Sequence, residues 1–111
     1  MNQYVKIITI NGSFNSNTSS EFQQNIAEIV QTNTKIVLVD FQNVIFMDSS
    51  GLGALILAFK ALKKANIKMV LCSINQQVKI LFELTSMDDI FEIYPNQDAF
   101  NQMFSSTINR I

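Results

Sequence analysis

Hydrophobic residues recur along the chain with two periods, one typical of strands and one typical of helices. Short apolar, β-branched runs predict four strands, at residues 5–10, 36–39, 68–74 and 91–94. Apolar residues three and four positions apart predict four helices, at residues 18–32, 49–65, 76–85 and 97–104. One more helical turn is expected at residues 87–90.

Side chains that can cap a helix stand where three of these helices are expected to begin. Thr18 and Glu21 have the spacing of a capping box, in which a hydroxyl and a carboxylate satisfy two backbone N–H groups. Asn75 is a favourable cap for the helix at residues 76–85. The start of the helix at residues 49–65 offers three candidate caps: Asp48, Ser49 and Ser50.

Strands and helices alternate throughout in this prediction. Such alternation predicts an α/β fold with a mostly parallel central sheet of about four strands and with four to five helices. The length of 111 residues indicates a single domain over residues 1–111, with its core at about 4–104. Function in such folds concentrates beyond the carboxyl ends of the strands, which here means residues 11–17, 43–50 and 73–76.

The composition narrows the classes of partner. Eight Lys and Arg residues against nine Asp and Glu residues leave a net charge of -1, without the basic field that gathers nucleic acid or anionic lipid. No apolar run approaches the roughly 20 residues that span a bilayer, and the first residues lack the pattern of a secretory leader. We therefore expect a cytoplasmic protein that binds no nucleic acid and does not insert directly into a membrane.

The absence of histidine excludes several catalytic and metal sites. A Ser-His-Asp or Cys-His nucleophile and a His-ligated zinc or haem site all require it. Asp40 and Asp48 alone are too few for the acidic Mg²⁺ cluster of a receiver domain, and Gly51 to Gly53 lacks the lysine of a Walker A loop. Cys72 lies in an apolar run and is expected to be a buried, inert thiol. The prediction is therefore no enzyme, no cofactor and no metal.

The segment from Asp48 to Gly53 combines glycines and hydroxyls at one expected helix start. Gly51 and Gly53 each cost close to 1 kcal/mol relative to alanine inside a helix, which suggests that another backbone or a ligand comes close. The hydroxyls of Ser49 and Ser50 stand where free N–H groups favour a phosphate. A covalent phosphate there would add roughly 1.5 to 2 negative charges and leave the fold intact. Simple helix capping is the competing interpretation.

One leucine of the same predicted helix falls on the side opposite its core stripe. Steps of 100° place Leu57 beside Gly53, Ala54, Lys60 and Lys64. A single exposed leucine is ordinary in soluble proteins. The alternative is that small residues around Leu57 form a docking face for a partner.

The eight residues from Asp48 to Leu55 resemble the STAS domain family and, within it, the free-standing bacterial anti-sigma factor antagonists. Gly12 and the segments 36–40, 69–74 and 78–85 support the resemblance, which covers roughly residues 4–104. It implies that the protein is a switch and a substrate, with no catalysis of its own. In this family, the unmodified protein binds a serine-protein kinase of the histidine-kinase-like ATPase fold, which often doubles as an anti-sigma factor.

The resemblance also implies roles for individual residues. The phosphorylated position is Ser49, and a PP2C-type phosphatase would restore the unmodified form. Asp48 would orient that serine or meet the kinase, and Ser50 would cap or support the helix. Partner contacts are expected from Gly51, Gly53 and Leu57 as well. Asn15 stands where the family often has aspartate, which weakens one electrostatic contact to the kinase.

A second interpretation is a non-phosphorylated adaptor, like the small STAS subunit of bacterial ABC complexes that transport lipid. The same helix face would then dock an ATPase, and Ser49 would be incidental. The intact Asp48-Ser49-Ser50 motif favours the phosphoswitch, although fold analogy alone does not decide function.

Overall fold

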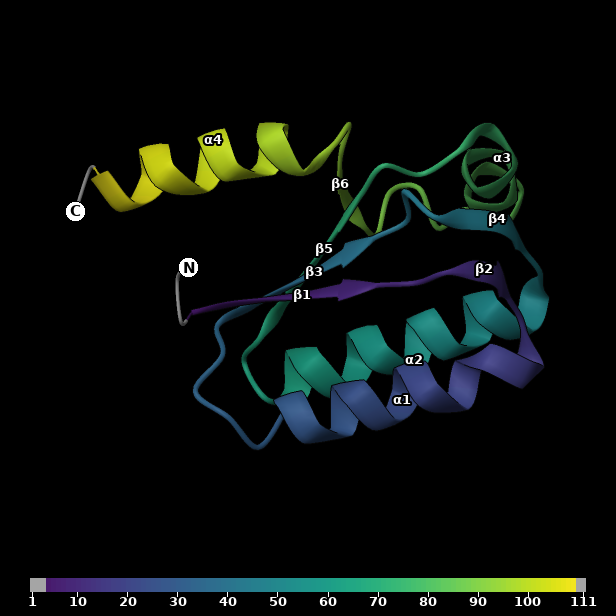
Figure 1. Ribbon diagram of the computed structural model, residues 1–111, viewed down its shortest axis with the longest axis horizontal. Coiled ribbons are helices and arrows are strands. Elements are labelled where there is room, and N and C mark those ends of the chain that lie inside the picture. Colours follow the sequence, from purple (N-terminus) through teal and green to yellow (C-terminus); the bar gives the residue numbers. More distant parts are fainter. Residues whose placement is uncertain (1–3, 110–111) are drawn as a thin grey trace.

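The computed structural model describes residues 4–109, which contain six strands and four helices (Figure 1). In chain order these are β1 (Val5–Thr9), β2 (Gly12–Phe14), α1 (Ser16–Ile29), β3 (Ile36–Asp40), β4 (Val44–Met47), α2 (Ser49–Lys64), β5 (Lys68–Cys72), α3 (Gln76–Leu84), β6 (Glu92–Tyr94) and α4 (Gln97–Asn109).

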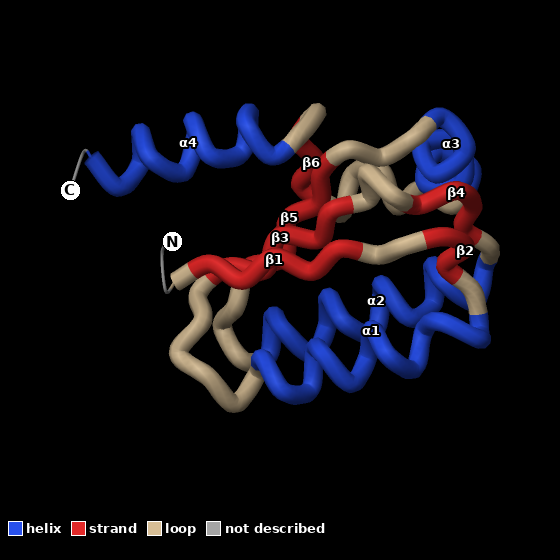
Figure 2. Tube along the Cα trace, viewed as in Figure 1, coloured by secondary structure: helices blue, strands red, loops and turns tan. Residues whose placement is uncertain are grey.

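Four strands form the central sheet in the order β1-β3-β5-β6, and all neighbours are parallel. Because side chains alternate along a strand, each face of the sheet has its own apolar cluster. Val37 and Val39 pack with α1, α2 and α3, whereas Leu38 packs with Phe100 of α4. Helices α1 and α2 therefore cover one face and α4 lies on the other (Figure 2).

The other two strands continue β1 and β3 beyond the end of that sheet. β2 and β4 pair in parallel with a register shift between Gly12 and Ser13, and the backbone N–H of Gly12 donates to Asn43 at 2.9 Å. Figure 1 shows this short ribbon between α3 and the first turns of α1 and α2. The ribbon carries the chain from the sheet to the point where α1 and α2 begin.

Helices α2 and α3 end in the same way, with a residue in the left-handed conformation. Asn66 after α2 has φ 62° and Ser86 after α3 has φ 59°. The next N–H in each case donates back to the last turn, from Ile67 to Leu62 and from Met87 to Phe82, both at 2.8 Å. These are Schellman motifs built without the usual glycine.

The four predicted strands and four predicted helices are present, although several of them begin or end at other residues than predicted. The ribbon strands β2 and β4 were expected to be loop, and α4 extends past 104 to Asn109. Residues 87–90 form a turn and no helix. The Thr18–Glu21 capping box is wrong, because Asn15 caps α1 one turn earlier and its partner in the capping box is Thr18. Asn75 caps α3 as predicted, through a 2.9 Å bond from the Val78 N–H.

The Schellman turn after α3 leads to the first prediction. Ser86→Gly should raise the free energy of unfolding by about 0.5–1 kcal/mol, because glycine reaches this φ without the steric cost of a Cβ. Ser20→Gly, on the exposed face of α1, is the matched control and should be destabilising. Urea denaturation of the two variants measures the difference. Equal destabilisation by both changes would contradict the proposed strain at Ser86.

Candidate functional site

Helices α1 and α2 begin side by side, because the strands that lead into them are paired. Phe14 and Met47 are register partners at the ends of β2 and β4, and the next residues, Asn15 and Asp48, are the caps of the two helices. The Asp48 N–H donates to the Phe14 carbonyl at 3.3 Å. Two positive helix ends therefore lie together at the carboxyl edge of the ribbon.

Asp48 is the residue that caps α2. Its carboxylate accepts the Gly51 N–H at 3.0 Å, and its carbonyl accepts the Leu52 N–H at 3.0 Å. Ser49 and Ser50 follow as the first two helical residues, and both are exposed. Within residues 4–109 neither hydroxyl makes a hydrogen bond, so the capping role considered for Ser50 belongs to Asp48. Both hydroxyls are open to a modifying enzyme.

The absence of a side chain at Gly51 sets how closely α2 approaches the ribbon. A Cβ placed there would lie 2.8 Å from the carbonyl carbon of Phe14 and would clash with its oxygen. Phe14 itself is fully buried, with its ring edge-on to Phe22 of α1 at 5.2 Å. Gly51 thus admits the close backbone approach that the sequence suggested for both glycines of this helix.

Gly53 has a different environment. A Cβ there would meet nothing within 4 Å, so internal packing does not require glycine at this position. Gly53 is four residues after Ser49 and four before Leu57, which places the three on one side of α2. Leu57 is 58% exposed, as predicted. The exposed Lys60 and Lys64 continue the same side toward the helix end.

Two large apolar residues of β4 also face solvent next to this helix start. Ile45 is 76% exposed and Phe46 is 49% exposed. The sequence analysis missed both, because residues 43–50 were expected to form a loop. The run of four apolar residues at 44–47 was the available signal for a strand. We use "docking face" for Ile45, Phe46, Ser49, Gly53 and Leu57.

Side chains from the start of α3 hold β4 in place on its free edge. The Gln77 carboxamide accepts the Met47 N–H at 2.9 Å and donates to the Met47 carbonyl at 2.8 Å. The Asn75 amide donates to the Val44 carbonyl at 3.0 Å. Gln77 therefore pairs with Met47 as a neighbouring strand would, and it fixes the backbone directly before Asp48. This role was not predicted from the sequence.

The structure brings most of the predicted site residues together. Asp48, Ser49, Ser50, Gly51, Gly53 and Leu57 lie on the first turns of α2, and Asn15 is adjacent through the ribbon. The Asn15 side chain is engaged in capping α1, where it accepts the Asn17 N–H at 2.9 Å. The three segments expected at the carboxyl edge also meet, through Asn75, Phe14 and the residues of β4.

The remaining ionisable groups do not gather into a metal-binding cluster within the described part of the chain. No cluster of three or more His, Cys, Asp or Glu residues that could hold a metal occurs in residues 4–109. Burial raises the pKa of the Cys72 thiol to about 11, with a further contribution from the charge of Asp40. Cys72 is buried and has no disulfide partner.

No helix among the described residues is long and apolar enough to cross a membrane.

The two glycines of α2 provide a matched pair for a second prediction. Gly51→Ala should lower the free energy of unfolding by about 1–3 kcal/mol, because the methyl group collides with the Phe14 backbone. Gly53→Ala should instead raise it by up to about 1 kcal/mol, since the methyl enters open space and alanine favours the helix. Chemical denaturation of both variants tests this. A stability loss at Gly53 equal to that at Gly51 would show that the contact with Phe14 is not the cause.

The chain matches the model of the STAS domain family over residues 2–99. It is 34% identical over 87 residues to an anti-sigma-B factor antagonist of Listeria monocytogenes, covering 78% of this chain and 75% of that protein.

Solved structures share the fold. The anti-sigma factor antagonist SpoIIAA in its unphosphorylated form superposes with a TM-score of 0.78 and 16% identity, over 95% of this chain and 92% of that one. The phosphorylated form from Bacillus gives 0.72 and 15%, over 93% and 94%. The STAS domain of a SulP transporter from Vibrio cholerae gives 0.80 and 18%, over 98% and 88%. With its α/β architecture and the helix start at Asp48, the chain belongs to the STAS domain family.

Proposed function

We propose that this protein is an anti-sigma factor antagonist that is switched by phosphorylation of Ser49. The observation that carries the proposal is an exposed serine hydroxyl at the first position of α2, on the same side as exposed Leu57 and three residues after exposed Phe46. Asp48 performs the capping, so the Ser49 hydroxyl is not needed to hold the helix. A reaction at Ser49 changes the docking face and leaves the fold in place.

The unmodified docking face suits a protein partner. Exposed apolar residues around a small residue offer a shallow surface that a partner side chain can cover. We propose that this partner is a serine-protein kinase of the histidine-kinase-like ATPase fold that doubles as an anti-sigma factor. The Listeria relative and SpoIIAA are both named anti-sigma factor antagonists, which supports an anti-sigma factor as the partner.

Phosphorylation would reverse binding through charge. A phosphate on Ser49 places roughly 1.5 to 2 negative charges next to the Asp48 carboxylate. A partner surface that buries Leu57 and Phe46 would have to desolvate that charge. A loss of about 2.8 kcal/mol at the interface weakens binding about a hundredfold. Partner choice therefore changes without refolding.

The rest of the cycle follows from the same assignment. A PP2C-type phosphatase removes the phosphate and restores the binding form, and the exchange takes place in the cytoplasm. The protein is the substrate of both enzymes and catalyses neither step. That a related SpoIIAA is known in both phosphorylated and unphosphorylated forms supports a reversible modification in this family.

The first test of this proposal is phosphosite mass spectrometry on the protein from its native host. We expect a single phosphate on Ser49 that phosphatase treatment removes. In the Ser49→Ala variant the phosphate should disappear, whereas Ser50→Ala, the adjacent control, should retain it. A phosphate that persists in Ser49→Ala would refute the site assignment. Absence of phosphate during growth, starvation and stress would favour the non-phosphorylated adaptor of an ABC lipid-transport complex.

The docking face gives a further prediction about affinity. Leu57→Lys should weaken binding to the kinase that modifies Ser49 by roughly tenfold or more, because an apolar contact is replaced by a charge that must be desolvated. Leu84→Lys is the matched control, since Leu84 is 79% exposed on α3. Calorimetric titration measures both affinities, and thermal unfolding should be unchanged in both variants. Equal affinities for the two variants would remove Leu57 from the interface.

A further inference from the structure

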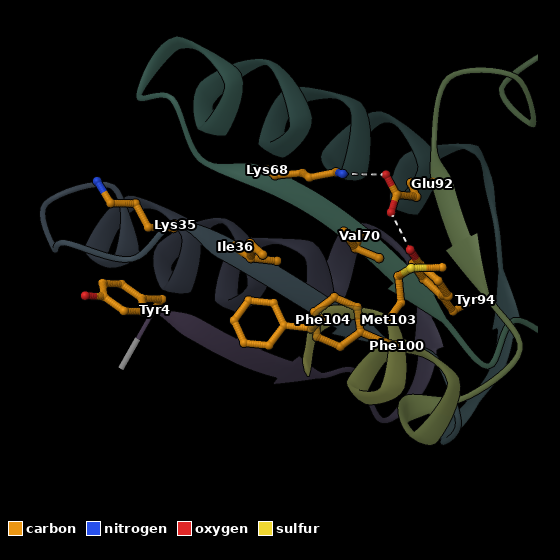
Figure 3. Close-up of a pocket in the computed structure, with 10 residues that line it drawn as sticks. All are labelled: Tyr4, Lys35, Ile36, Lys68, Val70, Glu92, Tyr94, Phe100, Met103 and Phe104. Carbon is orange, nitrogen blue, oxygen red and sulfur yellow. Dashed lines mark hydrogen bonds and ion pairs between the residues drawn. The ribbon is translucent and has the colours of Figure 1, made fainter. Parts of the chain in front are cut away.

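A hollow of about 400 Å³ lies between α4 and the central sheet, on the face away from α1 and α2 (Figure 3). Its size falls within the range of about 300–1,000 Å³ that is usual for small-molecule sites. Ile36 of β3 and Val70 of β5 form the floor, and Phe100, Met103 and Phe104 of α4 form the opposite wall. The hollow is separate from the docking face, because none of the docking-face residues lines it.

Apart from the charged residues of its rim, the hollow is lined by aliphatic and aromatic side chains. The rings of Phe100 and Phe104 stack at 5.8 Å, and Tyr94 meets Phe100 edge-on at 5.7 Å. Met103 retains 53% of its surface exposed, so this wall is not fully covered by the protein itself. An apolar body that enters the hollow would remove this surface from water, which is favourable.

Charged groups stand at two separate parts of the rim, with Lys68 and Glu92 at one and Lys35 at the other (Figure 3). The Lys68 ammonium pairs with the Glu92 carboxylate at 2.7 Å, and the Tyr94 hydroxyl donates to the same carboxylate at 2.8 Å. Burial alone would raise the pKa of Glu92, but the hydrogen bonds from Lys68 and Tyr94 outweigh it and lower that pKa. Glu92 is therefore an ionised group that Lys68 already neutralises.

Lys35 is a second cation on this rim. It directly precedes β3, and its carbonyl accepts the Lys68 N–H at 2.9 Å. The backbones of the two lysines are therefore direct neighbours at this end of the sheet. In residues 4–109, Lys68–Glu92 is the ion pair that the structure contains, and Lys35 takes part in none. Two cations and one anion leave the lined hollow with one positive charge in excess.

We propose that the hollow under α4 binds a small monocarboxylate with an apolar, chain-like body, of the medium-chain fatty acid class. The body lies between Val70 and the α4 residues Met103 and Phe104, and the carboxylate lies at the rim near Lys35. The apolar walls match the body and the excess positive charge matches the single anion. The proposal is independent of the role assigned to Ser49.

The site-specific test follows methionine methyl groups by NMR in the full chain, with sodium decanoate added below its micelle concentration. We expect a saturable shift of the Met103 methyl signal and none for Met47, which is buried on the other side of the sheet. No shift of the Met103 signal would overturn the proposal. Concentration-dependent broadening of that signal without decanoate would assign this face to a second copy of the chain and would also overturn it.

Two pairs of variants separate the contributions of wall and rim. Met103→Glu should abolish binding, whereas Gln102→Glu on the neighbouring α4 position should retain it.

Lys35→Gln should weaken decanoate binding roughly two- to fivefold, as for a solvent-exposed ion pair. Lys64→Gln, on α2 across the sheet, should leave it unchanged, and decanol should bind wild type more weakly than decanoate does. Equal losses within either pair would overturn the proposed placement.

Discussion

The close approach of α2 to the backbone of Phe14 is the contact on which the arrangement of the site depends. It exists because Gly51 has no side chain. Because α2 packs directly against the ribbon, the Asp48 N–H donates to the Phe14 carbonyl while the Asp48 carboxylate accepts the Gly51 N–H. Ser49 is then held at a fixed position relative to β4, although its own hydroxyl makes no bond within the described residues.

The supports of this region come from three separate parts of the chain. Phe14 anchors the ribbon in the core, Gln77 of α3 completes the hydrogen bonds of Met47, and the caps Asn15 and Asp48 begin two neighbouring helices. An exposed hydroxyl at this position is accessible without any movement of the backbone. This agrees with a switch whose two states differ in surface charge and not in fold.

Elements with a clear hydrophobic period were predicted correctly from the sequence. Elements that depend on pairing with residues far away in the chain were missed. The central strands and α2 carry enough apolar residues for their pattern to be clear. β2 contains a single large apolar residue, Phe14, and exists because β4 pairs with it across a register shift. Such pairing depends on residues about thirty positions away, which a local pattern does not record. Gln77 was missed for the same reason, since its partners lie on Met47.

Predictions within the site succeeded where the chemistry was local. Leu57 was placed on the exposed side by helical geometry alone, and Asn75 was identified as a cap from its position. The choice among Asp48, Ser49 and Ser50 as the cap of α2 depended on backbone angles that the sequence does not give. The same holds for Gly51 and Gly53, which look alike in the sequence and differ only in what lies beside them.

The separation of the apolar residues into two clusters has a consequence for how the protein opens. α4 is attached mainly through Phe100 and Phe104, together with a 2.6 Å bond from the Gln97 amide to the buried Asp40 carboxylate. Detaching α4 would leave the larger cluster beneath α1 and α2 covered. Amide protons of α4 would then exchange with solvent through a sub-global opening, before those of α2. The helix that presents Ser49 and the helix that closes the opposite face would thus open independently of each other.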